Sequence, residues 1–285
     1  MDIKTTVDTI LKNKKYEKDL MNNNLIILAA GISSRMKNSS VKGTMDSQLI
    51  EEANLKPKSM ISVGDGGRPF MDYLLFHAAE AGYKHVVIVI NERDGFTEPY
   101  YTTHETWGLD IQFARQIIPK GRSKPLGTAD AVLQGLIAKP EWAHEKFTIC
   151  NSDNLYSVSA FKVLREDTHF CAMIDYDRDG LGVEPERVNA FAVIWKDKDG
   201  FLEDIVEKPG KEDVERSADE NGRIGVSMNI FRLDYDASLP ELENCPLHPT
   251  RDEKELPTAI RMMMKKHLQA MFTIPVSERV PDLTS

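Results

Sequence analysis

Short apolar runs alternate along the chain with stretches in which apolar residues recur every three or four positions. Runs of the first kind predict buried strands, and stretches of the second kind predict helices with one buried face. Strands are predicted at residues 25–30, 86–90, 147–150, 170–174 and 190–195, and helices at 5–20, 71–82 and 128–138. This alternation predicts an α/β fold with a largely parallel sheet that is covered by helices on both faces.

The last third of the chain is predicted to be richer in strands. Strands are expected at 201–207, 224–233 and 270–276, with one helix over about 254–267. The polar stretch 37–55 interrupts the first strand–helix unit and has the character of a surface insertion. We therefore expect a helical extension over residues 1–24, followed by a single domain over residues 25–285.

Composition and charge limit the classes of function. The chain has 285 residues, of which 41% are hydrophobic and 28% charged, and its net charge is −9. Because nucleic acids and anionic membranes are bound by basic surfaces, this charge argues against both as partners. No apolar run reaches the roughly 18 residues that a membrane-spanning helix needs, and the N-terminus lacks the apolar core of a secretory signal.

The cysteines and histidines carry little chemistry in their spacing. Cys150, Cys171 and Cys245 form no CxxC pair, and Cys150 and Cys171 are expected to be buried thiols. The histidines are scattered, so a zinc site is not expected. These observations favour a reducing, cytoplasmic environment.

The strongest chemical signal follows the first predicted strand, in the segment LIILAAGISSRM at residues 25–36. A glycine followed by small residues lets successive backbone N–H groups turn toward an anion, and a following helix N-terminus adds partial positive charge. Arg35 could then offer its planar guanidinium to phosphate oxygens. The spacing alone fits a strand–helix turn with a surface arginine equally well, and neither GxGxxG nor a P-loop is present.

LAAGISSRM resembles the opening LAAGxGxRM motif of the sugar-phosphate nucleotidyltransferase family, the NDP-sugar pyrophosphorylases. Further segments resemble that family's motifs in the same order: KPKSMISVGDGGRPFMDYLLFHAAEAG, PLGTADAVLQG, ICNSDNLY, IVEKPG and SMNIFRL. The resemblance covers roughly residues 25–285. It implies a Rossmann-like three-layer α/β/α domain with a central mixed, mostly parallel sheet, of the nucleotide-diphospho-sugar transferase type.

The resemblance also implies a reaction and its residues. A sugar 1-phosphate attacks the α-phosphorus of a nucleoside triphosphate, pyrophosphate leaves and an NDP-sugar forms, so the protein mainly positions and neutralises polyanions. Arg35 and Lys58 are expected to be catalytic cations on the triphosphate, and Asp153 and Asp282 to hold Mg²⁺. The expected nucleotide-binding residues are Ala29, Ala30, Gly31, Ser33, Ser34, Gly127 and Thr128. The expected substrate-binding residues are Asn154, Glu207, Lys208 and Asn229.

Three features depart from the family pattern. Ser33 and Ile230 each stand where the pattern has glycine, and twenty-one residues separate Arg35 from Pro57. GISSRM also resembles the opening of transferases that act on molybdenum cofactors or small alcohol phosphates. Two alternatives therefore stay open: a non-sugar acceptor such as phosphocholine, or a non-catalytic regulatory protein that binds a nucleotide sugar. The sequence identifies neither the base nor the sugar, and it leaves the oligomeric state open, a homo-oligomer included.

Overall fold

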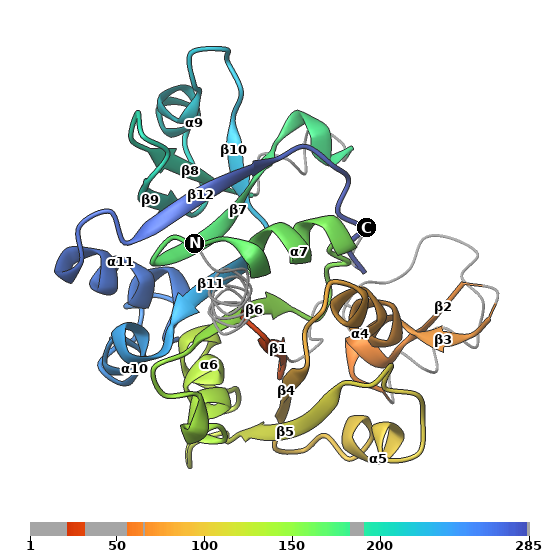
Figure 1. Ribbon diagram of the computed structural model, residues 1–285. Coiled ribbons are helices and arrows are strands. Elements are labelled where there is room, and N and C mark those ends of the chain that lie inside the picture. Colours follow the sequence, from red (N-terminus) through yellow and green to blue (C-terminus); the bar gives the residue numbers. More distant parts are fainter. Residues whose placement is uncertain (1–21, 32–55, 65, 183–190, 284–285) are drawn as a thin grey trace, which may run out of the picture.

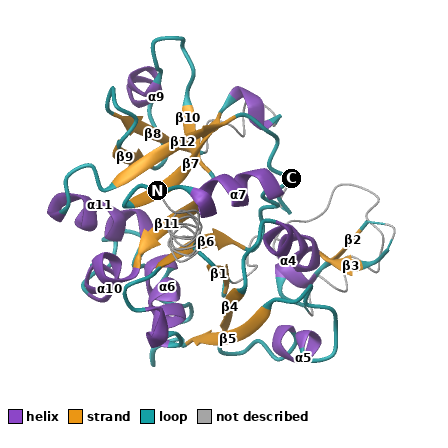
Figure 2. Ribbon diagram, viewed as in Figure 1, coloured by secondary structure: helices purple, strands orange, loops and turns teal. Residues whose placement is uncertain are grey.

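The computed structural model describes residues 22–31, 56–64, 66–182 and 191–283. The expected helix at 5–20 and the polar stretch 37–55 lie outside these ranges, and the division of the chain at residue 24 stays a prediction. The described residues form a ten-stranded mixed sheet with helices on both of its faces (Figures 1 and 2). None of the described helices is long and apolar enough to cross a bilayer.

The sheet is built from strands that are distributed over the whole described chain. They are β1 (Asn24–Ala29), β4 (His85–Asn91), β5 (Asp110–Gln116), β6 (Lys146–Asn151), β7 (Cys171–Asp177), β8 (Ala192–Lys196), β9 (Leu202–Val206), β10 (Gly225–Ser227), β11 (Ile230–Asp234) and β12 (Met271–Val276). The strand order is β5-β4-β1-β6-β11-β7-β10-β8-β9, and β12 pairs with β7 off this path. A separate two-stranded sheet joins β2 (Ser62–Val63) to β3 (Arg68–Pro69).

The parallel pairing is concentrated where the sequence predicts strand–helix alternation. β1 lies between β4 and β6, and β4 also pairs with β5, all in parallel. Beyond β6 the strand β11 is inserted antiparallel to both β6 and β7. β12 returns parallel to β7. The carboxyl ends of β1 and β6 consequently lie side by side at one edge of the sheet.

Two layers of helices cover the sheet. They include α4 (Phe70–Glu80), α5 (Thr97–Tyr101), α6 (Thr128–Ile137), α7 (Val158–Glu166), α9 (Lys211–Ser217), α10 (Tyr235–Glu243) and α11 (Leu256–Lys266). The apolar sides of α4 and α7 share one core with Leu25 and Ile27 of β1, whereas α6, α10 and α11 share the other core with Ile26. Because neighbouring residues of a strand face opposite sides, one continuous apolar run serves both cores. The expected three-layer arrangement around a mixed sheet is confirmed.

The expected strand at 224–233 is wrong as a single element. β10 ends at Ser227 and β11 begins at Ile230. Asn229 between them has a φ of 58°, in the left-handed region, which interrupts a regular strand. Before the turn, β10 pairs with the carboxyl-terminal part of β7, at Tyr176. After it, β11 pairs with the amino-terminal part of β7, at Met173.

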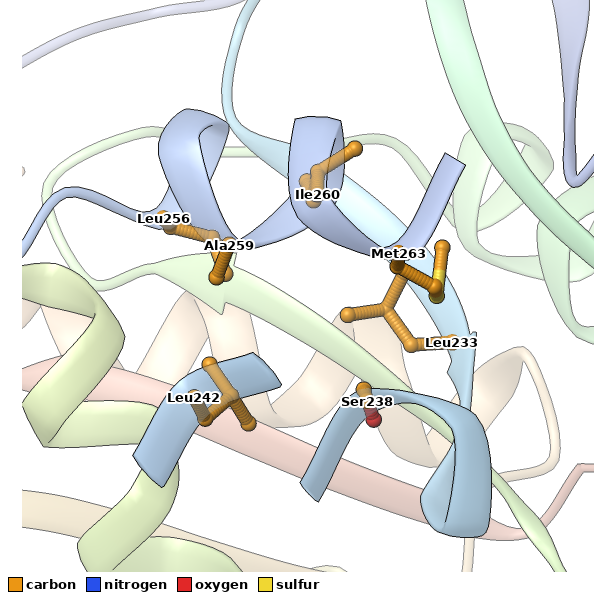
Figure 3. A pocket seen from close by; sticks show the side chains of 7 residues that line it. All are labelled: Leu233, Ser238, Leu242, Leu256, Ala259, Ile260 and Met263. Atoms are coloured by element: carbon orange, nitrogen blue, oxygen red, sulfur yellow. The ribbon is translucent and has the colours of Figure 1, made fainter. Parts of the chain in front are cut away.

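The second apolar core contains a small cavity between β11, α10 and α11 (Figure 3). Its wall includes Leu233, Leu242 and Met263, and its volume is about 10 Å³. That is room for about one water molecule. The cavity is therefore a packing defect of the core and is too small for a nucleotide or a sugar.

Candidate active site

Three expected site residues from distant parts of the sequence lie together near the carboxyl end of β6. Lys58 belongs to η1 (Lys58–Met60), Asp153 follows β6, and Asp282 lies in the segment after β12. Lys58 Nζ is 2.9 Å from Asp153 Oδ2 and 3.8 Å from Asp282 Oδ1. Open α/β sheets bind their ligands outside the carboxyl ends of the strands, so the cluster occupies the expected edge.

Backbone hydrogen bonds hold the two aspartates beside each other. The N–H of Leu155 donates to the carbonyl of Pro281 at 2.8 Å, and the N–H of Leu283 donates to the carbonyl of Asp153 at 3.0 Å. These two bonds flank Asp282 in a short antiparallel pairing. The backbone of Asp282 is therefore placed by main-chain hydrogen bonds, independently of the side chains in the cluster.

The cluster is partly accessible to solvent. The exposed fractions of the side chains are 16% for Lys58, 37% for Asp153 and 19% for Asp282. A ligand can reach these side chains, yet they are sufficiently removed from bulk water for the electrostatic interactions between them to be strengthened. Two carboxylates and one ammonium leave the cluster with one net negative charge.

The donor set fits a magnesium ion. Mg²⁺ prefers hard oxygen ligands and usually takes one or two carboxylates together with water and substrate phosphates. Asp153 and Asp282 supply two such carboxylates. Within the ranges that the structure describes, no group of three or more His, Cys, Asp or Glu side chains could hold a metal by itself. A metal at this pair would therefore take its remaining ligands from water and phosphate.

The glycine turn starts at the same edge. Leu28 of β1 is in register with Asn151 of β6, so Ala29, Ala30 and Gly31 follow at the level of the Asp153 loop. Both alanines are buried, whereas Gly31 is exposed, and a Cβ built on it would meet nothing within 4 Å. The other residues expected in this turn lie outside the described ranges, namely Ser33, Ser34 and Arg35.

Gly127 and Thr128 form the N-terminus of α6, where the chain packs tightly on a second loop. Gly127 has a φ of 108°, and a Cβ at this position would lie 2.6 Å from the carbonyl oxygen of Lys254. The hydroxyl of Thr128 accepts a hydrogen bond of 2.9 Å from the N–H of Leu256. Glycine is required here by both its backbone conformation and the close approach of another segment.

The side chain of Gln116, at the end of β5, forms hydrogen bonds to the turn at Gly127 and to the first turn of α6. Its buried amide donates to the carbonyl of Gly127 and to a carboxylate oxygen of Asp130, each at 2.8 Å. Asp130 is therefore a buried structural partner, in the first turn of a helix whose N-terminal dipole also favours a carboxylate.

The expected substrate-binding residues fall into two groups. Asn154 is buried, and its amide donates to the hydroxyl of Tyr156 at 3.2 Å and to the carbonyl of Met228 at 3.3 Å. These bonds tie the Asp153 loop to the turn that contains Asn229. The second group follows β9, where Glu207 accepts from both terminal nitrogens of Arg251 at 3.3 Å. Lys208 adjoins it with a φ of 51°.

The cysteine nearest the cluster is not a nucleophile. Cys150 is completely buried in β6, and burial, followed by the negative charge of Asp153, raises the pKa of its thiol. Burial likewise raises the pKa of Cys171 to about 11. A thiol must ionise to attack a substrate, so covalent catalysis through these residues is disfavoured at neutral pH. Both expected burials are confirmed.

A family model described as "Nucleotidyl transferase" matches residues 48–274. The match covers well over half of the chain. The chain belongs to the nucleotidyl transferase family. The resemblance found in the motifs is thereby confirmed at the level of the family.

Two curated proteins illustrate the distance within this nucleotidyl transferase family. The bifunctional protein GlmU of Geotalea uraniireducens (strain Rf4) is 26% identical over 228 residues, which cover 78% of this chain and 42% of that protein. A glucose-1-phosphate adenylyltransferase of Corynebacterium jeikeium (strain K411) is 24% identical over 152 residues, which cover 51% of this chain and 36% of that protein. The chain thus spans about two fifths of the length of the curated relatives it matches.

Solved structures share the fold over nearly the whole chain. A UDP-glucose pyrophosphorylase complexed with UDP-glucose has a TM-score of 0.63 at 19% identity, with 92% of each chain covered. The UTP-bound UGPase of Acinetobacter baumannii has a TM-score of 0.64 at 19% identity, with 93% of this chain and 90% of that chain covered. HddC of Yersinia pseudotuberculosis, complexed with GMP-PN, has a TM-score of 0.58 at 16% identity over 92% and 94%. These identities establish similarity of fold.

Gln116 and Arg251, which sequence reasoning missed, contact residues that are expected in the site. Each contacts an expected site residue, Gln116 through the carbonyl of Gly127 and Arg251 through Glu207. Neither residue lies in a segment that resembles a family motif. The only available signal was the charged run RDEKE at residues 251–255, which is typical of an exposed loop.

Proposed function

We propose that this nucleotidyl transferase joins a nucleoside triphosphate to a sugar 1-phosphate, giving an NDP-sugar and pyrophosphate. The convergence of Lys58, Asp153 and Asp282 carries the proposal. It combines one cation for phosphate oxygens with two carboxylates for a divalent metal, which is what phosphoryl chemistry requires of a protein. One relative named for glucose 1-phosphate and structures bound to UDP-glucose and UTP support this choice of substrates.

The proposed mechanism is one of alignment and charge neutralisation. An oxygen of the sugar 1-phosphate attacks the α-phosphorus, and the bond from that phosphorus to the bridging oxygen of pyrophosphate breaks. Asp153 and Asp282 hold the metal, Mg²⁺ in this proposal, which when bound stabilises the charge on the phosphate oxygens. Lys58 contributes its ammonium to the triphosphate, together with Arg35 from the glycine turn.

The remaining assignments follow the two sides of the reaction. On the nucleotide side, the turn after β1 offers backbone N–H groups through Gly31, and Gly127 with Thr128 borders the base. On the sugar side, Glu207 accepts hydrogen bonds from sugar hydroxyls and Lys208 pairs with the sugar phosphate. Asn154 and Asn229 belong to the same side in this proposal, Asn154 by fixing the turn and Asn229 by lying in it. A cytoplasmic location is part of the proposal and is supported by the three free thiols.

The decisive experiment measures pyrophosphate release by the purified protein with Mg²⁺. Each common triphosphate is tested against a panel of sugar 1-phosphates, with phosphocholine as the non-sugar acceptor. We expect release with one sugar 1-phosphate that is lost in Lys58→Ala and Asp153→Ala and retained in His144→Ala. His144 is a suitable control because its side chain is 87% exposed. Release with phosphocholine alone, or nucleotide-sugar binding without turnover across the panel, would refute the proposed reaction.

A further inference from the structure

The ammonium of Lys58 lies against both carboxylates that are proposed to hold the metal. It donates to Asp153 at 2.9 Å and lies 3.8 Å from Asp282. The lysine comes from η1, far in sequence from either aspartate, and its side chain is only 16% exposed. The ammonium therefore offsets one of the two negative charges of the carboxylate pair.

We propose that Lys58 acts as an internal substitute for the divalent metal. In the nucleotide-free protein its ammonium competes with metal for Asp153 and Asp282. The triphosphate then draws the ammonium away, so that metal and nucleotide bind together. This inference rests on the proposed function, since it assigns the same lysine to the triphosphate.

Competition follows from charge and distance. A magnesium ion requires its oxygen ligands at about 2.0–2.1 Å, and an ammonium that stays hydrogen-bonded to the same carboxylate oxygen would lie close enough to repel it strongly. Lysine carries its charge on a flexible four-carbon stem, so it can leave the carboxylates without moving the backbone. A triphosphate offers that ammonium several anionic oxygens in exchange.

The two segments that carry the carboxylates are held together without the lysine. The main-chain bonds from Leu155 to Pro281 and from Leu283 to Asp153 keep the two segments paired. Removing the ammonium consequently leaves two neighbouring carboxylates in place, with more net negative charge. A dication is attracted more strongly to such a pair, so loss of Lys58 is expected to improve metal binding even as it removes a catalytic cation.

The test measures Mn²⁺ binding to the full chain without nucleotide, by following free Mn²⁺ with electron paramagnetic resonance. Lys58→Met keeps the length of the side chain and removes the charge, and we expect it to bind Mn²⁺ about tenfold more tightly, the factor that corresponds to 1.4 kcal/mol. Lys58→Arg keeps the charge and is expected to bind Mn²⁺ as weakly as the unchanged protein. Asp153→Asn added to Lys58→Met is expected to abolish the gain.

Lys146→Met is the matched control for net charge. Lys146 begins β6 and pairs with Asp234 at 3.0 Å, at the opposite end of the strand from Asp153. Lys146→Met removes one positive charge from β6 without touching the cluster. The Mn²⁺ affinity of this variant is expected to equal that of the unchanged protein. An equal gain in this control, or no gain in Lys58→Met, would overturn the proposal.

A second measurement uses the unchanged protein, in case the substitutions at Lys58 impair folding. The side-chain ammonium signal of Lys58 is followed by NMR in protein labelled with ¹⁵N-lysine. Mg²⁺ together with a non-hydrolysable triphosphate should move this signal at metal concentrations at which Mg²⁺ alone leaves it unchanged. A signal that moves equally with Mg²⁺ alone would overturn the proposal that the triphosphate draws the ammonium away and lets the metal bind.

These measurements need no turnover, so the two proposals fail separately. Competition observed in a protein that releases no pyrophosphate with any acceptor would refute the proposed reaction alone. If the protein releases pyrophosphate but Lys58→Met binds Mn²⁺ no more tightly than the unchanged protein, only the proposed competition between Lys58 and the metal is refuted.

Discussion

Replacing Gly127 by alanine tests the close packing of two loops beside the N-terminus of α6. The new Cβ would lie 2.6 Å from the carbonyl oxygen of Lys254, 2.9 Å from Cβ of Glu253 and 3.1 Å from the nitrogen of Lys254. Two of these neighbours are backbone atoms, which cannot turn aside as a flexible side chain can. The substitution must therefore move one loop away from the other.

The expected loss has two parts. The φ of 108° and ψ of −172° lie in a region that is essentially restricted to glycine, at a cost of roughly 1–3 kcal/mol for other residues. Overpacking against the Lys254 backbone adds about 1–3 kcal/mol. We expect Gly127→Ala to lower the free energy of unfolding by about 2–6 kcal/mol, a large part of the roughly 5–15 kcal/mol that stabilises a typical domain.

Urea denaturation followed by tryptophan fluorescence measures this loss, and Gly121→Ala is its matched control. Gly121 also has a positive φ, of 87°, but a Cβ on it would meet nothing within 4 Å. The control therefore carries a cost for its positive φ without the steric contact, and Gly127→Ala should be less stable than it by about 1–3 kcal/mol or more. Equal unfolding midpoints for the two variants would show that the approach of Lys254 is not what requires glycine at 127.

Three further predictions concern buried charge, the proposed metal site and pH. Arg232 is 2% exposed and pairs with Asp167 at 2.8 Å. Arg232→Ala should therefore lower the free energy of unfolding, measured by urea denaturation, by about 3–5 kcal/mol. A loss of about 1 kcal/mol or less, as expected for an exposed ion pair, would refute a buried salt bridge. Asp282→Asn should reduce pyrophosphate release by about 10²-fold or more while nucleotide-free folding, measured by circular dichroism, is unchanged; full activity would remove Asp282 from the site. The pKa of Cys171 is raised from 9.0 to about 11, so the folded state retains a proton that the unfolded state loses, and its contribution to stability is complete below pH 9 and lost as pH rises through about 11. Cys171→Ala should therefore show a shallower loss of unfolding free energy between pH 8 and pH 11, and identical pH profiles would contradict the raised pKa.

The sequence predicted the central strands well because they are apolar on both faces. β1 and β4 contain continuous apolar runs, β6 departs from one only at the buried Thr148, and each predicted range agrees with the observed strand to within a residue at each end. β5 escaped prediction because it lies at the end of the strand order and alternates polar with partly buried residues. Its signal is a period of two, which is weaker than a continuous run.

Four of the described α-helices were not predicted, namely α5, α7, α9 and α10, and α7 and α10 illustrate the local reasons. α7 follows Ser157, whose hydroxyl accepts a hydrogen bond from the N–H of Ala160, but only three of its residues are buried. α10 contains Pro240, which usually argues against a helix. In α10 the proline lies in the second turn, and packing against α6 and α11 outweighs its cost. Tertiary contacts of this kind leave no mark in a local pattern.

The candidate site was predictable in its residue types and not in its geometry. Motif resemblance selected Lys58, Asp153 and Asp282, but nothing in the sequence states that one ammonium contacts both carboxylates. The pairing that brings these segments together is a hydrogen bond between main-chain atoms of Leu155 and Pro281. Because every residue carries the same main-chain groups, the sequence does not indicate which of them pair. Arg251 was missed for the same reason, because ion pairs between distant loops show no periodicity.

The pairing of the Asp153 loop with the segment at 281–283 also sets the time at which the site is completed during synthesis. Chains fold as they emerge from the ribosome, N-terminal parts first. A nascent chain that has already formed β1, β4 and β6 possesses Lys58 and Asp153 but lacks the second carboxylate. The complete cluster forms only after residue 283 has emerged, so ribosome-bound chains stalled before that point are expected to fold much of the sheet without acquiring the complete proposed metal site.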